Sequence, residues 1–506
     1  MAETADLRRW LEAGARAVHH ARDRLDAINV FPVPDSDTGT NLYLTLQEGN
    51  RAVAKLGADA THREVVAAFA RGALVGARGN SGVIVSQYLT AFLSAIDERG
   101  GLTGADGRAI ARSLDVAADA AYRSVGSPVE GTILTVARAA AQGAADAVEA
   151  KAGREATAVA AVIAARAALA LTQEQLPSAR EAGVVDAGAA GLVLQLEMLA
   201  ETLAGPDALA AIDEVEWESA DRARRSRRHA HDRHDEHVAD HGGAYEVMFV
   251  ATSQEDIRDA LTGELETIGD SVAVTGAHDL WQAHVHTDEP HRAVESGIRS
   301  RARQIVVRNV QMGHDADRAA TGIVALTSCP GLAEPLADAG AVVLVVPDPL
   351  ALKRRALRRA VKDASGTEAV IVAGHPALRA AAGELARKRR KPALTVLDAQ
   401  HEAHVVAAVA AAALTTPGQD LAGEMATAVA ATTAGDSTSD ALDADVDRMI
   451  DADTEIVTLV LASGVPDSVA DSVRLSVHGV APYADVNVYQ GGHSEPAVII
   501  GVERAL

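Results

Sequence analysis

Cysteine and aromatic residues are scarce in this chain, and both shortages limit how it can fold. The 506 residues contain one cysteine, Cys329, which excludes an internal disulfide and any zinc site built from several cysteines. Aromatic residues make up 3% of the chain. We therefore expect cores built from Ala, Val and Leu, with helices that approach each other closely.

Long apolar runs without charges or helix breakers are also missing. The beginning, MAETADLRRWLEAG, has no apolar stretch of signal-peptide length, and the Ala-rich run near 403–413 is too short for a membrane span. We therefore expect a cytoplasmic protein with no integral membrane segment.

Basic residues are outnumbered by acidic ones. The chain has 47 Lys and Arg against 70 Asp and Glu, a formal net charge of −23. Nucleic-acid binding needs a basic face that displaces counterions, so this balance argues against a nucleic-acid partner. It also disfavours an anionic membrane as the main partner, although a local basic patch stays open.

Changes of texture along the chain predict three domains, which suits its length. Residues 1–205 carry apolar residues at three- and four-residue spacing and read as an all-α domain. Residues 221–243, rich in Arg and His, read as a disordered linker, with a His-rich metal tract as the alternative. Residues 244–315 read as a small α+β domain, and 321–506 as an α/β domain with buried parallel strands. Within the last domain, we expect a loop at 435–440.

The most informative segment is NVFPVPDSDTGTNLYLT, which begins at Asn29. Two prolines prevent a helix before Asp35, and Asp35 and Asp37 form a D-x-D pair just ahead of a helix start. Paired carboxylates suit Mg²⁺, and free N–H groups at a helix N-terminus suit phosphate oxygens. The alternative is an ordinary turn, with Asp and Thr capping local N–H groups.

Three further Gly- or Pro-containing segments each precede an expected helix. They are GARGNSGVIVSQ from Gly76, SPVEGTILTV from Ser127 and VVDAGAAGLVL from Val184. Glycine permits close backbone approach to a phosphate, although each segment alone could be a helix–helix turn. Together they indicate that several helix N-termini converge on one anion, without any G-x-x-x-x-G-K-[ST] string.

In order and spacing, these four segments resemble the all-α nucleotide-binding domain of dihydroxyacetone kinases. The closer resemblance is to the catalytic chains of multidomain fatty acid kinases, which are DAK2-domain proteins. It implies an all-α nucleotide-binding helical barrel, then an α+β middle domain, then an α/β C-terminal domain that helps to engage a partner. Two departures stand out: Ser36 replaces the Gly usual between the aspartates, and the Gly-Gly-Gln-Thr-Met-Asn-Pro-Ser-like segment of the last domain is replaced by AVVLVVPDPLALKR.

The resemblance also implies site residues. Asp35 and Asp37 would bind Mg²⁺, with two ions expected, and Asn29 is preferred over Asp26 as the upstream polar residue. The residues implied at the ATP phosphates or near the nucleotide are Thr38, Thr40, Asn41, Asn80, Ser81, Gly82, Thr132 and Asp186.

A pair of histidines marks the middle domain. His284 and His286 in WQAHVHTDEP are two apart, so in a strand they share a face that could hold a metal or position an acyl group. Paired histidines on a strand can also be purely structural. The strand AYEVMFVAT lacks the cysteine that some relatives carry, which leaves a His-only site or one completed by Glu246 or Asp288.

We therefore expect an ATP-dependent phosphotransferase. The acceptor implied by the resemblance is a fatty-acid carboxylate presented by a separate fatty-acid-binding protein, with an acyl phosphate as product and His284 or His286 orienting the acceptor. One alternative is a kinase of a small hydroxy-ketone or polyol, and the other is a non-catalytic nucleotide-binding regulator or scaffold. A homodimer is left open.

Overall fold

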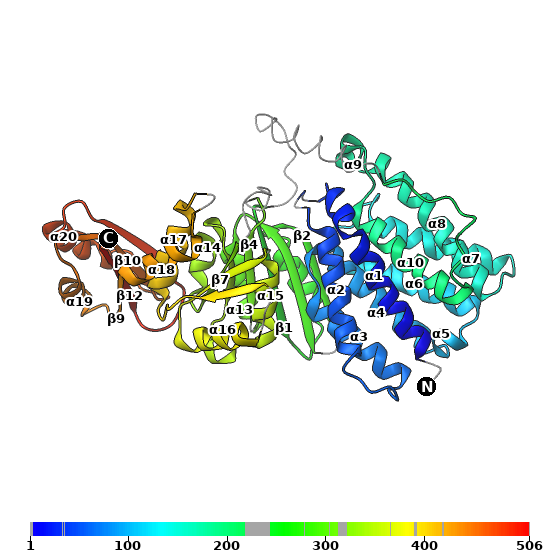
Figure 1. Ribbon diagram of the computed structural model, residues 1–506, viewed down its shortest axis with the longest axis horizontal. Helices are drawn as coiled ribbons and strands as arrows, with labels where there is room; N and C mark the ends of the chain where they lie inside the picture. The colour runs from blue at the N-terminus through cyan, green and yellow to red at the C-terminus, as the bar shows by residue number, and fades with distance from the viewer. Residues whose placement is uncertain are drawn as a thin grey trace. The chain divides into compact units, whose positions relative to one another are not determined.

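The computed structural model describes residues 4–504, apart from 33, 35, 218–242, 278, 303, 312–320, 365, 389–391 and 417–418 (Figure 1). It divides into two compact units. The first comprises Met1–Gly242 and Ser253–Val285, and the second comprises Gly243–Thr252 and His286–Leu506.

The first part of the chain is helical. Its helices are α1 (Ala5–Ala27), α2 (Thr38–Val53), α3 (His62–Gly76), α4 (Gly79–Asp97), α5 (Gly101–Gly104), α6 (Gly107–Arg123), α7 (Ile133–Glu149), α8 (Arg154–Gln175), α9 (Pro177–Ala182) and α10 (Ala187–Ala204). Neighbouring helices contact each other in the ring α1-α2-α4-α6-α7-α8-α10, and α10 returns to α1. This closed ring is the helical barrel that the sequence predicted.

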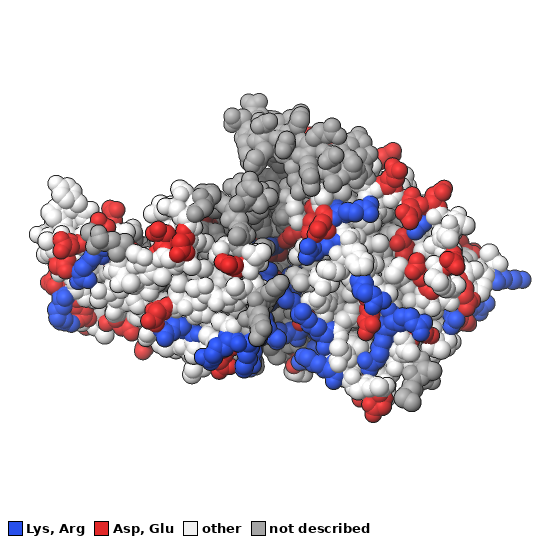
Figure 2. All heavy atoms as spheres, in the orientation of Figure 1, with Lys and Arg blue, Asp and Glu red and all other residues white. Residues whose placement is uncertain are grey.

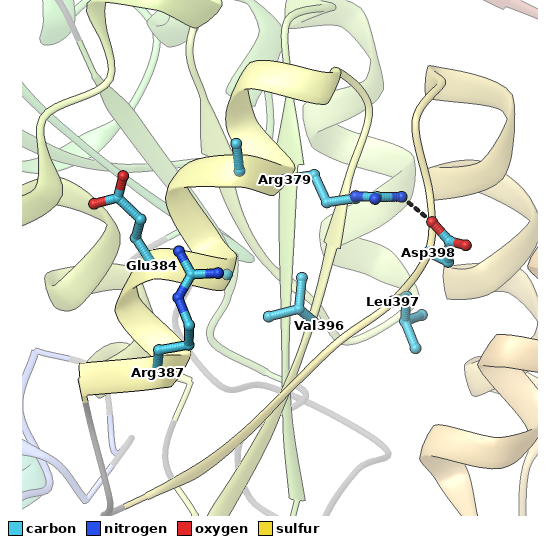
Figure 3. Close-up of a pocket in the computed structure, with 8 residues that line it drawn as sticks. Arg379, Glu384, Arg387, Val396, Leu397 and Asp398 are labelled. Carbon is cyan, nitrogen blue, oxygen red and sulfur yellow. Dashed lines mark hydrogen bonds and ion pairs between the residues drawn. The ribbon is translucent and has the colours of Figure 1, made fainter.

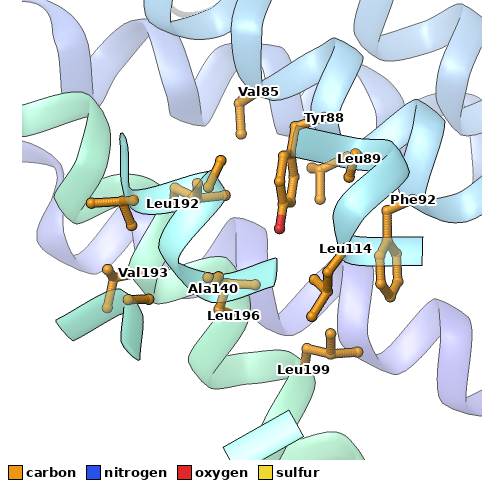
Figure 4. Packing of buried hydrophobic residues seen from close by; sticks show 14 of the residues in the cluster. Val85, Tyr88, Leu89, Phe92, Leu114, Ala140, Leu192, Val193, Leu196 and Leu199 are labelled. Atoms are coloured by element: carbon orange, nitrogen blue, oxygen red, sulfur yellow. The ribbon is translucent and has the colours of Figure 1, made fainter. Parts of the chain in front are cut away.

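The centre of the barrel is packed with apolar side chains, as Figure 4 shows around Tyr88, Leu114 and Leu192. Small residues let the helices approach closely, as expected from the low aromatic content. A Cβ atom on Gly49 would lie 2.6 Å from the ring of Phe69, so α2 and α3 can pack this tightly only with glycine there.

Eight strands of the described chain form one mixed sheet, in the order β2-β3-β1-β4-β6-β5-β7-β8. Their bounds are β1 (Tyr245–Thr252), β2 (Asp270–Ala277), β3 (Leu280–Thr287), β4 (Ile305–Asn309), β5 (Thr321–Thr327), β6 (Val342–Val345), β7 (Glu368–Ala373) and β8 (Ala393–Val396). Strands β5 to β8 are parallel, whereas β4 pairs antiparallel with both β1 and β6. The connecting helices are α12 (Arg258–Leu265), α13 (Pro290–Arg299), α14 (Ala333–Asp338), α15 (Arg354–Asp363) and α16 (Pro376–Lys388), with short 3-10 turns η2 (Pro330–Leu332) and η3 (Pro349–Ala351).

A second sheet completes the chain, in the order β11-β10-β12-β9. Its strands are β9 (Thr432–Ser437), β10 (Thr454–Leu461), β11 (Asp485–Gln490) and β12 (Val498–Arg504). Helices α17 (Glu402–Leu414) and α18 (Leu421–Ala431) precede it, and α19 (Leu442–Met449) and α20 (Val469–Val480) lie between its strands in sequence.

The structure confirms the predicted fold class, a multidomain chain with a helical region followed by sheet-containing middle and α/β regions. The loop predicted at 435–440 was wrong in its first half, because residues up to Ser437 belong to β9, where Ser437 pairs with Val498. The predicted linker 221–243 lies outside the described residues except for Gly243. The three-domain division stays a prediction, and β4 and β6 pair across its boundary at 315–321.

Two described helices, α8 and α10, are long and apolar enough to span a membrane by length and composition alone. Half or more of the most apolar window of each is buried inside the barrel, which is the usual environment of a core helix. This is weak evidence for a membrane span.

Candidate active site

The first turn of α2 is held by Asn29 and Asp37. The Asn29 Oδ1 atom accepts hydrogen bonds from the backbone N–H of Thr38 at 3.2 Å and from the Thr38 hydroxyl. The Nδ2 atom of Asn41 donates to Asp37 Oδ1 at 2.7 Å. Three of the predicted ATP- or metal-binding side chains, Asn29, Thr38 and Asn41, are thus brought to one helix start, beside Asp37.

Asp26 takes part in the same helix start, although the sequence argument preferred Asn29. It accepts from the backbone N–H of Thr40 at 2.9 Å and from the Thr40 hydroxyl at 2.8 Å. Burial, reinforced by the nearby charge of Asp37, raises the pKa of Asp26 to about 6 despite these bonds. The Thr40 hydroxyl is therefore engaged by Asp26. A signal was present in the sequence, because Asp26 lies in the last turn of the preceding helix.

Ser36 has a φ of 56°, in the left-handed region that favours glycine. This explains why glycine is usual at this position in the resembled family. A serine here costs about 1–2 kcal/mol of backbone strain. Asp35, the other half of the D-x-D pair, lies outside the described residues.

The start of α4 abuts that of α2. Gly79 has a φ of 55°, and a Cβ atom on it would lie 2.6 Å from Asn41 Nδ2. A Cβ atom on Gly82 would lie 2.5 Å from the Thr45 hydroxyl. The Oδ1 atom of Asn80 is buried and has no hydrogen-bond partner among the described residues. Glycine is therefore required where these two loops meet, and a polar atom of the loop is left for a ligand.

Helices α7 and α10 begin with capping residues that the sequence analysis singled out. The Thr132 hydroxyl accepts from Leu134 N at 3.3 Å, and Asp186 Oδ2 accepts from Ala189 N at 2.7 Å. Burial raises the pKa of Asp186 to about 6, although backbone N–H groups favour its charged form.

Gly188 joins these starts to α4. A Cβ atom on Gly188 would lie 3.1 Å from Ser81 Oγ, 3.3 Å from Asp186 Oδ2 and 3.6 Å from Ile133 Cβ. The N-termini of α4, α7 and α10 therefore meet around one glycine, and α2 joins them through Asn41. Aligned helix N-termini present free N–H groups and partial positive charge, which suits phosphate oxygens.

Strand β3 carries the histidine pair. Gln282, His284 and His286 alternate along it and so share one face. Gln282 Nε2 donates to the carbonyl oxygen of Ala77 at 2.8 Å, just before the start of α4. Ala273 of β2 packs with Ala77 and Val83, and Gly126 N donates to Val272 O at 3.1 Å. The β2–β3 hairpin is therefore attached to the barrel beside a predicted phosphate loop.

His284 and His286 cluster with Glu246. One ligand atom from each lies within 4.8 Å of the others, and all three side chains are buried. Glu246 also forms an ion pair with Arg308. Burial works to raise the pKa of Glu246, but the positive charges of Arg308 and of neighbouring groups outweigh it, so the pKa lies below its usual value. Asp288, the other candidate, instead accepts from Ala244 N at 2.7 Å.

Comparison with protein families assigns three stretches of the chain. A DAK2 domain matches residues 32–201, a FakA-like middle domain of fatty acid kinases matches 242–316, and a FakA-like C-terminal domain matches 426–503. The chain belongs to the FakA-like fatty acid kinase family of DAK2-domain proteins. The first match contains the four converging helix starts, and the second contains Glu246 and both histidines.

Individual relatives agree with this assignment. Protein YloV of Bacillus subtilis is 35% identical over 285 residues, which cover 55% of this chain and 50% of that protein. An uncharacterized protein of Staphylococcus haemolyticus is 29% identical over 353 residues, 66% of this chain and 62% of its own length. An uncharacterized protein of Staphylococcus aureus is 30% identical over 292 residues, with 56% and 51% covered. The matched stretches thus span about half to three-fifths of these relatives.

Proposed function

We propose that this protein transfers the γ-phosphoryl group of ATP to the carboxylate of a fatty acid presented by a separate fatty-acid-binding protein, giving an acyl phosphate, and that it does so in the cytoplasm. The kinase family implies ATP, and the FakA-like domains support this class of acceptor. The observation that carries the proposal is the meeting of the α4, α7 and α10 N-termini at Gly188, with α2 attached through Asn41.

We propose that Asn41, Asn80, Ser81 and Gly82 face the phosphates, while Thr38 and Thr40 hold the α2 start. Such a site fits ATP because a phosphate chain needs many fixed N–H and hydroxyl donors and little room for side chains. Preorganised donors stabilise the charge that moves during transfer, which is most of what phosphoryl transfer requires of a protein. Thr132 and Asp186 would set the third and fourth helix starts around the nucleotide.

Asp35, Asp37 and Asn29 would hold Mg²⁺, with two ions expected. Carboxylate and amide oxygens are the ligands that Mg²⁺ takes from proteins, and Asp37 lies beside the phosphate-facing helix start. The bound metal would neutralise phosphate charge. The acceptor carboxylate is already ionised at neutral pH, so no side chain has to remove a proton from it.

His284 and His286 are proposed on the acceptor side of the reaction. They are 0% and 4% exposed, so direct contact with an acyl group would require β3 to move. We therefore propose that they act with Glu246 as one positioning cluster, connected to the phosphate loop through Gln282 on the same face. One carboxylate and two imidazoles also form a donor set that zinc accepts, and metal analysis of the purified protein before and after His286→Ala would detect such an ion.

The proposal is tested by following labelled phosphate from ATP into three kinds of acceptor. These are a lipid-loaded fatty-acid-binding protein, a free fatty acid, and dihydroxyacetone or glycerol. Transfer only to the loaded protein supports the proposal. Transfer to the small hydroxy compounds would establish the polyol kinase instead. ATP binding without consumption in any arm would favour a regulator or scaffold.

A further inference from the structure

Helix α15 places a concentrated positive charge on a chain whose net charge is −23. Residues 353–362, KRRALRRAVK, contain six basic residues and no acidic one. Ala356, Leu357, Ala360 and Val361 are buried, so the apolar side of the helix is already used for packing within its unit. The polar side is what remains for a partner.

Five basic side chains of α15 and α16 make up what we call the basic surface. Lys353, Arg354 and Arg358 are exposed on or beside α15, and Arg387 and Lys388 are exposed at the end of α16. Figure 2 shows Lys and Arg gathered over these helices. Arg359, by contrast, turns inward to Asp363, at 3.7 Å, and to the sulfur of Met248.

The two helices are joined across this surface by a shared acid. Glu384 pairs with Arg354 at 2.5 Å and with Lys388 at 3.9 Å. One carboxylate against five basic residues leaves a net charge of 5 − 1 = +4 on the basic surface. The excess charge is therefore not neutralised by the protein itself.

Apolar groups lie beside these charges. Leu350 of η3 is 83% exposed, three residues before Lys353, and η3 contacts α16. A groove of about 460 Å³ runs between α16 and β8 and is lined by Ala380, Val396 and Leu397 as well as by charged residues. In Figure 3 Arg379 points to Asp398, with which it pairs, and Arg387 and Glu384 lie further along α16.

We propose that the basic surface and Leu350 bind the surface of an anionic phospholipid bilayer. Clustered Lys and Arg on a helix attract anionic headgroups, and an adjacent exposed leucine can enter the headgroup region. An acidic protein would be attracted by the charges but would not explain an exposed leucine beside a groove with apolar and cationic walls. Because the rest of the chain is acidic, only this face would approach such a bilayer. The inference does not depend on the proposed kinase activity.

The test is cosedimentation of the full chain with vesicles of phosphatidylcholine alone or with a quarter phosphatidylglycerol, at low and high salt. We expect binding only to the anionic vesicles, and weaker binding at high salt. Each charge removed should weaken binding about fivefold, so Arg354→Gln with Arg358→Gln should weaken it about 25-fold.

The matched control removes two exposed arginines of α1, Arg9→Gln with Arg16→Gln, whose side chains are 62% and 63% exposed and also pair with acids. It should bind like the wild type. No binding to anionic vesicles, or equal losses in the two double variants, would overturn the proposal. Capture of polyglutamate but not of vesicles would identify an acidic protein as the partner and would overturn it equally.

Discussion

The side-chain amide of Gln282 donates a hydrogen bond to the backbone carbonyl of Ala77 at 2.8 Å, across 205 positions of sequence. The two residues are buried. The bond joins the strand of the histidine pair to the loop that opens α4.

Replacing Gln282 with leucine should slow phosphoryl transfer more than it weakens nucleotide binding. The change takes this donor away from the buried Ala77 carbonyl, at a cost of about 1–3 kcal/mol of unfolding free energy. A small displacement of a positioning element can lower turnover by about tenfold or more. Steady-state kinetics and ATP titration would separate the two effects. Gln142→Leu, an exposed site on α7, is the control, and equal effects of both variants on turnover would contradict the positioning role.

Asp37→Asn should abolish turnover without unfolding the protein. Asparagine retains an oxygen that can accept from Asn41 Nδ2, so the helix start stays capped, but the charge proposed to hold Mg²⁺ is lost. Activity assays and thermal unfolding would be compared with Asp23→Asn, whose side chain is 86% exposed. Asp35→Asn should behave like Asp37→Asn. Turnover near that of the wild type in either variant would refute the metal assignment.

Ser36→Gly should stabilise the protein by about 0.5–1 kcal/mol. Relief of the left-handed strain, about 1–2 kcal/mol, outweighs the extra chain entropy that glycine loses on folding, about 0.5–1 kcal/mol. Denaturant unfolding measures the change. The same substitution at Ser94, exposed within α4, should destabilise by about 0.5 kcal/mol, since glycine disfavours helix interiors. A loss of stability in Ser36→Gly would mean that the serine makes a compensating contact.

Gly188→Ala should weaken ATP binding. The new methyl group would stand 3.1 Å from Ser81 Oγ and 3.3 Å from Asp186 Oδ2, and so would narrow the space where the helix starts meet. Calorimetric ATP titration provides the measurement. Gly263→Ala serves as the control, because no atom lies within 4 Å of its added Cβ. It should leave ATP affinity unchanged, and unaltered affinity in Gly188→Ala would remove this glycine from the nucleotide site.

Glu402 should make stability fall as pH rises above the ordinary carboxyl range. Burial raises the pKa of Glu402, against hydrogen bonds donated by Thr327 and Ser328. The folded state therefore holds its proton at pH values where the unfolded state has lost it, and stability declines until the raised folded pKa is passed. Unfolding curves at several pH values should show this decline in the wild type and a smaller one in Glu402→Gln. Glu384→Gln, at a half-exposed site, should keep the wild-type slope; identical slopes in all three proteins would contradict the assignment.

Much of the fold was predictable because local signals and tertiary structure agree. Thr132 and Asp186 cap helices where the sequence places helix starts, and the Val-rich runs of β5 to β7 are buried parallel strands. Strand β9 was missed because its sequence, TTAGDS, carries no apolar alternation. It is a strand because β12 supplies its hydrogen-bond partners.

The site was predictable in part for a similar reason. Each helix start could be recognised alone, but the glycine contacts that bring them together join positions far apart in sequence, such as Ser81 and Gly188. The Gln282–Ala77 bond had no local signal at all, since nothing near a glutamine in a strand indicates a partner 205 residues away. The pairing of Glu246 with the histidines likewise depends on neighbouring strands.

The most direct test of the central claim is to trap the product. The full chain is incubated with ATP, Mg²⁺ and a lipid-loaded fatty-acid-binding protein, and hydroxylamine is added, which converts an acyl phosphate to a hydroxamate that mass spectrometry can identify. Our account predicts fatty hydroxamate that depends on ATP and is absent with Asp37→Asn. ATP hydrolysis without hydroxamate, or hydroxamate formed equally by Asp37→Asn, would contradict it.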